Sequence, residues 1–306
     1  MVDLSTKLGS LRLKNPITVA SGTFGYGDEM SSIIDLNQLG ALSVKGLTLQ
    51  PRKGNFPRRI VETPSGMLNA IGLQNIGVNA FIQEKVPFLE KFSLAVIANI
   101  NGESVEDYVE LAKKLEPISR VDALEINLSC PNVKEGGMWF GQDPQKVYEI
   151  TSKVKTIFKR TIITKLSPNV TRISDMAKAV EQAGGDAVAM VNTFVGMMIN
   201  PWQKKPLLTQ GHGGLSGPAI KPIALHMVWQ VFQNTKIAIL GMGGIESLED
   251  VLSFLIAGSS AIALGTSNFY NPTLSMEILG ELANALKKLN VNSIGELIGT
   301  LEIPKK

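Results

Sequence analysis

The sequence contains very little of the two residue types that most often bind metals, with one cysteine and two histidines in 306 residues. A disulfide needs two cysteines, and an all-cysteine zinc site or an iron–sulfur cluster needs about four such ligands. These three features are therefore excluded within this chain, and no metal site is expected. Any electron relay through iron and sulfur must lie in another polypeptide.

Charged residues are also few, and neither sign dominates. They make up 19% of the chain, while hydrophobic residues make up 44%. An average soluble domain has about 25% charged residues, so this composition predicts a large buried core. The 30 basic residues are spread among 27 acidic ones. Nucleic-acid binding is therefore not indicated.

Long apolar runs are missing as well. No run approaches the ~18 residues that span a bilayer. Residues 1–15 alternate polar and apolar side chains, which is unlike the basic flank and apolar block of a secretion signal. We therefore expect a cytoplasmic protein that does not contact a membrane.

Apolar segments of strand length alternate with segments of helical periodicity along the chain, which is typical of parallel α/β architecture. Eight strands are predicted, at residues 17–21, 41–45, 94–99, 123–127, 161–165, 187–192, 237–241 and 261–265. Helices are predicted at residues 27–39, 78–91, 104–115, 144–158, 173–183, 218–232, 248–257 and 272–289. This uninterrupted series favours a closed (β/α)8 TIM barrel formed by residues 1–306 as a single domain. Residues 4–13 predict a short hairpin at the barrel floor.

Three predicted connections are long, at residues 46–77, 128–143 and 193–217. All three follow the C-terminal ends of strands, which is the face where barrels carry their active sites. Loops of this length in a compact domain are usually functional. We therefore expect the site at this face.

Polar side chains end the first six predicted strands: Ser21, Lys45, Asn99, Asn127, Lys165 and Asn192. An Asn side chain offers one acceptor and two donors, which complement the edge of a pyrimidine ring or of the pyrimidine portion of a flavin. Lys45 and Lys165 lie in apolar strands, where an unpaired ammonium is costly. A phosphorylated, partly anionic cofactor would suit them. A structural ion pair with Glu125 is the alternative.

Glycines follow the last two strands, in Gly241-Met-Gly-Gly-Ile245 and at Gly265. In barrels, the loops after strands seven and eight often bind phosphate, because glycine backbone amides can approach its oxygens closely. The sequence therefore predicts a phosphate site here.

Cys130 is the one cysteine, in the segment Asn127-Leu-Ser-Cys-Pro-Asn132 directly after the fourth strand. A lone cysteine is most often a small buried apolar residue. Cys130, however, is predicted on a loop at the reactive face. A thiol with an ordinary pKa of ~8.5 can act there as a nucleophile or a general base.

These features together resemble the dihydroorotate dehydrogenases, specifically the catalytic subunit of the NAD-linked type B enzymes. The resemblance covers essentially the whole chain and rests on Ala20-Ser-Gly-Thr-Phe-Gly25, Lys45-Gly-Leu-Thr48, Gly54-Asn-Phe-Pro-Arg58, Met67-Leu-Asn-Ala-Ile-Gly-Leu-Gln-Asn75, Asn127-Leu-Ser-Cys-Pro-Asn132, Gly213-Gly-Leu-Ser-Gly-Pro-Ala-Ile-Lys-Pro222 and Gly241-Met-Gly-Gly-Ile245. Cysteine at 130, where the quinone-linked enzymes have serine, points away from that branch. The segment 67–75 is similar to type B rather than to the fumarate-linked type A.

The resemblance implies a set of site residues. FMN would be held by Ser21, Lys45, Gly46, Asn99, Asn127, Lys165, Val191, Gly217, Gly243, Gly244, Gly265 and Thr266. The substrate would be held by Lys45, Asn69, Ala70, Ile71, Gly72, Leu73, Asn127, Asn192 and Thr193. Cys130 would be the catalytic base. Asn200 and Trp139 depart from the family pattern, which expects an aspartate and a small residue there.

The implied reaction is the oxidation of (S)-dihydroorotate to orotate in de novo pyrimidine biosynthesis. Cys130 would take a proton from the substrate, and FMN would accept the hydride. Electrons would then pass to NAD+ through a partner subunit that carries FAD and a [2Fe–2S] cluster, in a heterotetramer of two catalytic and two electron-transfer subunits.

Two other readings remain open. A flavoprotein similar to dihydropyrimidine dehydrogenase would use the same flavin and cysteine on uracil or thymine derivatives. A flavin-free isomerase or aldolase would use the phosphate site for its substrate and Lys165 for a Schiff base. A purely structural role would leave the polar strand ends unexplained.

Overall fold

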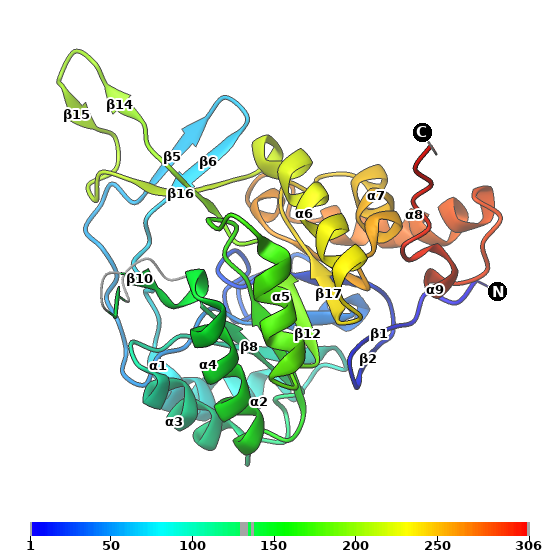
Figure 1. The fold of residues 1–306 in the computed structure, drawn as a ribbon, viewed down its shortest axis with the longest axis horizontal. Helices are drawn as coiled ribbons and strands as arrows, with labels where there is room; N and C mark the ends of the chain where they lie inside the picture. Colours follow the sequence, from blue (N-terminus) through cyan, green and yellow to red (C-terminus); the bar gives the residue numbers. More distant parts are fainter. Residues whose placement is uncertain (1, 129–133, 136–137, 305–306) are drawn as a thin grey trace.

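The computed structural model describes residues 2–128, 134–135 and 138–304. Its centre is a closed barrel of parallel strands (Figure 1). In order around the barrel these are β3 (Ile17–Val19), β4 (Ala41–Ser43), β7 (Ala95–Ile100), β8 (Ala123–Asn127), β11 (Thr161–Lys165), β12 (Ala187–Met190), β17 (Ala238–Gly241) and β18 (Ala261–Leu264). The barrel closes where β18 pairs with β3. The predicted (β/α)8 barrel is confirmed, and each strand boundary lies within two residues of its prediction.

Helices cover the outside of the barrel and follow its strands in turn. They are α3 (Val105–Leu115), α4 (Pro144–Ile157), α5 (Ile173–Gln182), α6 (Lys221–Asn234), α7 (Leu248–Ala257) and α8 (Leu274–Lys288). A continuous helical segment precedes β7 and consists of α1 (Gly77–Ala80), a π-helical turn η3 (Phe81–Lys85) and α2 (Val86–Leu89). Serine or aspartate side chains accept a hydrogen bond from the first turn of several helices, as Ser104 does for α3 and Ser247 for α7. A short helix, α9 (Ile294–Leu297), lies near the C-terminus.

The helix predicted over residues 27–39 is wrong. The segment contains two 3-10 turns instead, η1 (Met30–Ser32) and η2 (Leu36–Gln38). Side chains compete with the helical pattern here, because Ser31 donates to the carbonyl of Asp28 and Asp35 accepts from the amide of Asn37. Such local bonds favour turns over helices.

A hairpin closes the floor of the barrel, as predicted. Its strands β1 (Thr6–Leu8) and β2 (Leu11–Leu13) place the wholly buried Leu8 and Leu13 against the barrel interior. Most of the interior strand residues that they meet are alanines, which leave room for the two leucines. Gly9 turns the hairpin with φ 59°, a conformation that favours glycine.

All three long loops contain strands that were not predicted from the sequence. Strands β5 (Ile60–Thr63) and β6 (Gly66–Asn69) pair with β13 (Phe194–Gly196) and β16 (Gly213–Ser216) in one antiparallel sheet of order β13-β16-β6-β5. The segment between β13 and β16 projects as a hairpin of β14 (Ile199–Asn200) and β15 (Lys205–Pro206), at the upper left of Figure 1. The third loop contains β9 (Lys134–Glu135), η4 (Phe140–Gln142) and β10 (Met138–Trp139).

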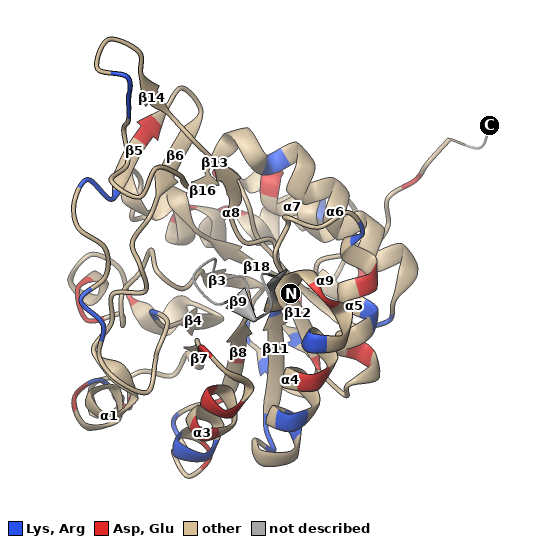
Figure 2. Cartoon of the chain, turned by 60° about the vertical axis from the view of Figure 1, so that its left-hand side comes forward, with Lys and Arg blue, Asp and Glu red and all other residues tan. Residues whose placement is uncertain are grey.

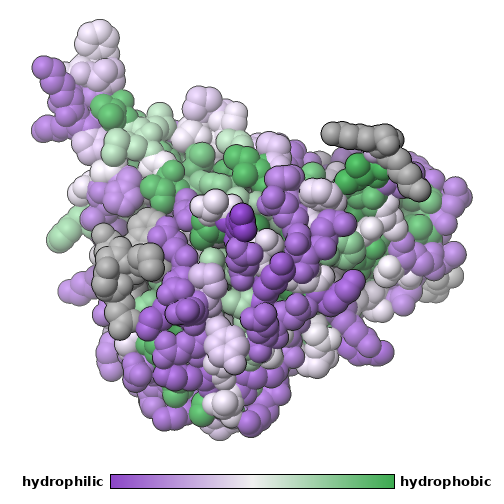
Figure 3. Space-filling view, in the orientation of Figure 1, coloured by the Kyte–Doolittle hydropathy of each residue, from purple (hydrophilic) through white to green (hydrophobic). Residues whose placement is uncertain are grey.

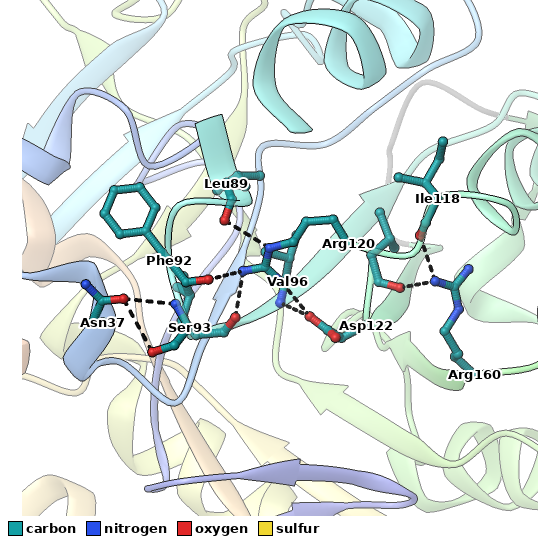
Figure 4. A network of polar contacts seen from close by, with 11 residues as sticks. Asn37, Leu89, Phe92, Ser93, Val96, Ile118, Arg120, Asp122 and Arg160 are labelled. Atoms are coloured by element: carbon teal, nitrogen blue, oxygen red, sulfur yellow. Dashed lines mark hydrogen bonds and ion pairs between the residues drawn. The ribbon is translucent and has the colours of Figure 1, made fainter. Parts of the chain in front are cut away.

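Arg120 ties the end of α2 to the start of strand β8 (Figure 4). Its guanidinium donates to the carbonyls of Leu89, Phe92 and Leu94 at 2.9, 3.2 and 2.7 Å. It also pairs with Asp122 at 2.9 Å. Arg120 therefore links the end of α2 and the residues that follow it to the segment before β8.

Arg160 has the equivalent place before β11 and donates to the carbonyl of Leu115, the last residue of α3, and to those of Ile118 and Val121 in the segment that follows. Both arginines precede their strands and so belong to the end of the barrel away from the predicted site. Two arginines therefore stabilise this end of the barrel through hydrogen bonds to backbone carbonyls.

In the view of Figure 2, acidic and basic residues are interspersed along outer helices such as α3 and α4. The face drawn in Figure 3 is mostly hydrophilic, and apolar side chains gather near the base of the β14–β15 hairpin. Val195, Met197 and Ile199 are exposed in that segment. Within the described residues, no helix has the length and apolar character needed to cross a membrane.

Candidate active site

Three neighbouring strands carry polar side chains into the upper barrel. In the register, Asn99 on β7 lies opposite Glu125 on β8, and Lys165 on β11 lies opposite Asn127. Side chains alternate along a strand, so Glu125 points the same way as Asn127 but one layer lower. A polar layer thus replaces the apolar interior toward the C-terminal ends of these strands.

Hydrogen bonds link this layer. The amide nitrogen of Asn99 donates to Glu125 Oε2 at 2.6 Å, and that of Asn101 donates to Asn99 Oδ1 at 2.9 Å. Lys165 Nζ lies 3.9 Å from Glu125 Oε1. That distance satisfies an ion pair but is too long for a hydrogen bond. The Lys165 ammonium thus makes no hydrogen bond to a described residue, and its N–H groups can donate to another acceptor.

Lys45 follows β4 at the same face and is half-buried. Burial, and then the positive charge of Arg59, hold the pKa of Lys45 below its ordinary value, while Glu29 acts in the opposite direction. The chain has thus gathered positive charge where an anion would be stabilised. Next to it, Gly46 lies so close to the Asn101 amide that a Cβ atom would come within 2.4 Å of Nδ2.

Asn127, Asn192 and Thr193 meet at the ends of β8 and β12. Asn192 Nδ2 donates to Asn127 Oδ1 at 3.4 Å, and the amide of Thr193 donates to Asn192 Oδ1 at 2.8 Å. Tyr108, on α3, donates its hydroxyl to the backbone carbonyl of Asn127 at 2.8 Å. Asn127 and Asn192, both predicted site residues, are therefore in contact, and Tyr108 fixes the backbone of Asn127.

The predicted substrate loop, residues 69–73, follows β6. Asn69 Nδ2 donates to the carbonyl of Gly214 at 3.3 Å, and the side chain of Asn55 donates to the carbonyl of Ala70. The amide of Asn55 bonds the carbonyl of Ile71. Gly72 and Leu73 both have positive φ, a costly conformation for leucine. This part of the loop therefore has a fixed and unusual shape.

The predicted phosphate glycines come together from three segments. A Cβ on Gly244 would lie 2.7 Å from the carbonyl of Gly217, and one on Gly217 would lie 3.6 Å from the Thr266 side chain. Thr266 also donates to the Ser216 hydroxyl at 2.8 Å. Gly217 directly precedes η5 (Pro218–Ile220) and α6, so the glycines lie beside the start of this helical segment.

The other predicted FMN residues flank these groups. Val191 is buried, and its side chain lies 3.6 Å from a Cβ built on Gly243. A Cβ on Gly265 would have only Ala20 nearby, at 3.9 Å, so the space beside it is open. Ser21 lies in the turn after β3 and is half-exposed.

Cys130 lies outside the described residues. Of Trp139, only the backbone is described, in β10. Asn200 lies in β14, away from the strand ends, and its side-chain oxygen accepts from the amides of Trp202 and Gln203. Asn200 therefore shapes the hairpin turn, which an aspartate would do equally well.

The sequence analysis missed two asparagines that shape the loops. Asn75 bonds the side chain of Thr48 and the carbonyl of Leu73. Asn169 donates to the carbonyl of Thr193 and accepts from the amide of Val195. The signal was available for Asn169, because it lies in the turn-forming segment Ser167-Pro168-Asn169 shortly after the fifth strand, which ends at Lys165.

The family model described as dihydroorotate dehydrogenase matches residues 3–286. The chain belongs to the dihydroorotate dehydrogenase family. The resemblance found in the sequence is thereby confirmed.

Several dihydroorotate dehydrogenases are similar along their full length. A protein from Thermoanaerobacter pseudethanolicus, named dihydroorotate dehydrogenase B (NAD(+)), catalytic subunit, is 50% identical over 302 residues, or 99% of this chain and 100% of that protein. A protein of the same name from Parabacteroides distasonis is 47% identical over 305 residues, or 100% of both chains. The crystal structure of DHODH in complex with ferulenol, from Eimeria tenella, has a TM-score of 0.81 at 22% identity and covers 97% of this chain and 88% of that one. That likeness shows the barrel fold.

Proposed function

We propose that this chain is the catalytic subunit of an NAD-linked dihydroorotate dehydrogenase and oxidises (S)-dihydroorotate to orotate in pyrimidine biosynthesis. The observation that carries the proposal is the match of names, family and length: relatives about half identical over the whole chain are all named for this activity. The polar layer at the barrel mouth supplies donors and acceptors that suit a pyrimidine ring.

FMN fits the residues of this single barrel domain. Gly217, Gly243 and Gly244 have no room for a side chain, since a Cβ on each would lie within 2.8 Å of another atom of the chain. We propose that the backbone amides of these glycines bind the phosphate oxygens. Lys165 has N–H groups available for an acceptor, and Asn101 Oδ1 is a buried oxygen with no hydrogen-bond partner in the described chain. We propose that Ser21, Lys45, Gly46, Asn99, Asn127, Val191, Gly265 and Thr266 complete the site.

When bound, FMN would supply the acceptor for the substrate's hydride. The chain's own residues would bind and orient the substrate. Lys45 would attract the substrate carboxylate, and Asn127, Asn192 and Thr193 would hold the ring edge together with residues 69–73. Lys165 would stabilise the negative charge that develops on the flavin as it is reduced. Cys130 would accept the proton from the substrate carbon, a role that rests on the family resemblance.

The name "catalytic subunit" of the relatives implies a second subunit for those proteins. We propose that electrons leave this chain through a partner subunit that carries FAD and a [2Fe–2S] cluster, and that they then reach NAD+. We also propose that two chains of each kind assemble into a heterotetramer. The single cysteine of this chain agrees with that division. Co-expression with the neighbouring subunit and measurement of the mass of the complex test this assembly, and a lone catalytic chain would contradict it.

The test of the activity is anaerobic mixing of the purified chain with substrate. We expect a yellow protein that releases FMN on denaturation and whose flavin absorbance is bleached by dihydroorotate but not by dihydrouracil. Bleaching by dihydrouracil would favour the dihydropyrimidine dehydrogenase reading. A colourless protein with no FMN would favour a flavin-free barrel.

A further inference from the structure

Glu125 is a buried carboxylate to which the proposed reaction gives no task. It has no exposed surface, and it lies within the barrel one layer below Asn127. Its two oxygens have different surroundings. Oε2 accepts the 2.6 Å hydrogen bond from Asn99, whereas Oε1 has no hydrogen-bond partner among the described residues.

The unbonded oxygen faces the ammonium of Lys165. Lys165 Nζ lies 3.9 Å from Oε1, and the Lys165 side chain is only 6% exposed. A buried charge without a partner is strongly unfavourable, so each of these groups requires the other. Asn99 fixes the carboxylate on the opposite side, and Asn101 in turn fixes Asn99. The position of Glu125, and with it the charge felt by Lys165, is therefore set by neighbouring strands.

We propose that Glu125 is a positioning residue that anchors the Lys165 ammonium at the end of β11 and offsets part of its positive charge. Lys165 would then stabilise the added negative charge of the reduced flavin only partly, and Glu125 would keep the reduction potential of the flavin low. This inference rests on the proposed function, because it requires FMN beside Lys165. A carboxylate that served folding alone would leave the potential unaffected.

The test is the midpoint potential of the FMN-loaded protein, measured by anaerobic reductive titration of the wild type and of Glu125→Gln. The amide can still accept from Asn99 but carries no charge. We expect the potential to rise by the equivalent of about tenfold in the equilibrium toward reduced flavin, or about 30 mV for a two-electron couple. An unchanged or lower potential would overturn the proposal.

Two further variants separate this role from a structural one. Asp122→Asn is the matched control, because it also removes a carboxylate paired with a cation, at the floor of the barrel. We expect Asp122→Asn to lower the melting temperature and to leave the potential unchanged. An equal rise in potential in Asp122→Asn would overturn the proposal.

The double variant Glu125→Gln with Lys165→Met removes both charges and leaves neither buried alone, so it serves if Glu125→Gln does not fold. We expect it to have the potential of Lys165→Met alone, because Glu125 acts through Lys165. A clear difference between these two potentials would contradict that route. A wild-type protein that binds no FMN would overturn the proposed function and this inference together. If the wild type binds FMN but Glu125→Gln leaves the midpoint potential unchanged, only the inference is overturned.

Discussion

The hydroxyl of Tyr108 donates a 2.8 Å hydrogen bond to the backbone carbonyl of Asn127. Tyr108 belongs to helix α3 on the outside of the barrel, while Asn127 ends strand β8 at the proposed site. The outer helix layer thus fixes the backbone position of Asn127, a residue of the proposed substrate site. An outer residue can therefore influence the reaction without touching the substrate.

Tyr108→Phe should lower both stability and activity. The change leaves the Asn127 carbonyl without this donor, which costs about 1 kcal/mol in the free energy of unfolding. A small displacement of Asn127 should lower kcat/KM for dihydroorotate by about threefold to tenfold. Urea denaturation and steady-state kinetics measure the two effects. Tyr148→Phe, on the outer face of α4, is the control and should change neither.

Lys45 should give the substrate affinity a pH dependence. Burial and Arg59 lower the pKa of Lys45 from its ordinary value of 10.5. Below the lowered pKa the side chain is charged and attracts the substrate carboxylate, and as the pH rises through that pKa the charge is lost. KM for dihydroorotate should therefore rise with pH in a window below 10.5.

The matched variants for this pH dependence are Lys45→Arg and Lys53→Arg. Arginine stays charged over the whole range, so Lys45→Arg should lose the rise in KM. Lys53 is exposed on the same loop, and its replacement should leave the profile as it is. A profile that is the same in wild type and Lys45→Arg would show that another group is responsible.

Gly244→Ala should remove FMN from the protein. A Cβ at this position would come within 2.7 Å of the Gly217 carbonyl, and φ is +76°. The loop must shift, and the backbone surface offered to the phosphate shifts with it. Gly211→Ala is the control, because φ is +85° there too but no atom lies within 4 Å of the added carbon. The FMN-to-protein absorbance ratio should fall at least about fivefold in Gly244→Ala and stay near the wild-type ratio in Gly211→Ala.

Arg120→Ala should affect stability rather than chemistry. Arg120 bonds three main-chain carbonyls and Asp122 at the floor of the barrel, and removal of such charge-assisted bonds costs about 3 kcal/mol or more. The melting temperature should fall by several degrees while kcat of the folded protein is maintained. Arg12→Ala, an exposed arginine of the floor hairpin, should shift the melting temperature little. A loss of kcat in Arg120→Ala at temperatures where it is fully folded would contradict this assignment.

The barrel strands could be predicted from the sequence because each is a short apolar run that is buried on both sides. Residues 123–127 and 161–165 are matched residue for residue. Their polar ends were also visible, since Asn127 and Lys165 interrupt an otherwise apolar pattern. Gly243, Gly244 and Gly265 were predicted to lie at a phosphate site because the loops after strands seven and eight often have that role in barrels, whereas Gly217 was named only by the family resemblance.

The sheet above the barrel could not be predicted in the same way. Strands β6 and β16 are separated by more than 140 residues in sequence, and each is rich in glycine or too short to show alternation. Their pairing depends on the barrel bringing two loops together. The helix predicted at residues 27–39 failed for a local reason, because Ser31 and Asp35 bond nearby main-chain groups. An ion pair between Lys165 and Glu125 was named from the sequence as an alternative and is present at 3.9 Å. The contact of Asn99 with Glu125 required the strand register, which the sequence pattern does not contain.

The rate of flavin reduction in Cys130→Ala tests the central claim most directly. The FMN-loaded protein is mixed anaerobically with dihydroorotate in a stopped-flow instrument, and the flavin absorbance is followed. Because only the proton acceptor is removed, reduction should slow by about 10² to 10⁴-fold while the FMN content stays that of the wild type. Bleaching at the wild-type rate in a variant that retains FMN would contradict the account.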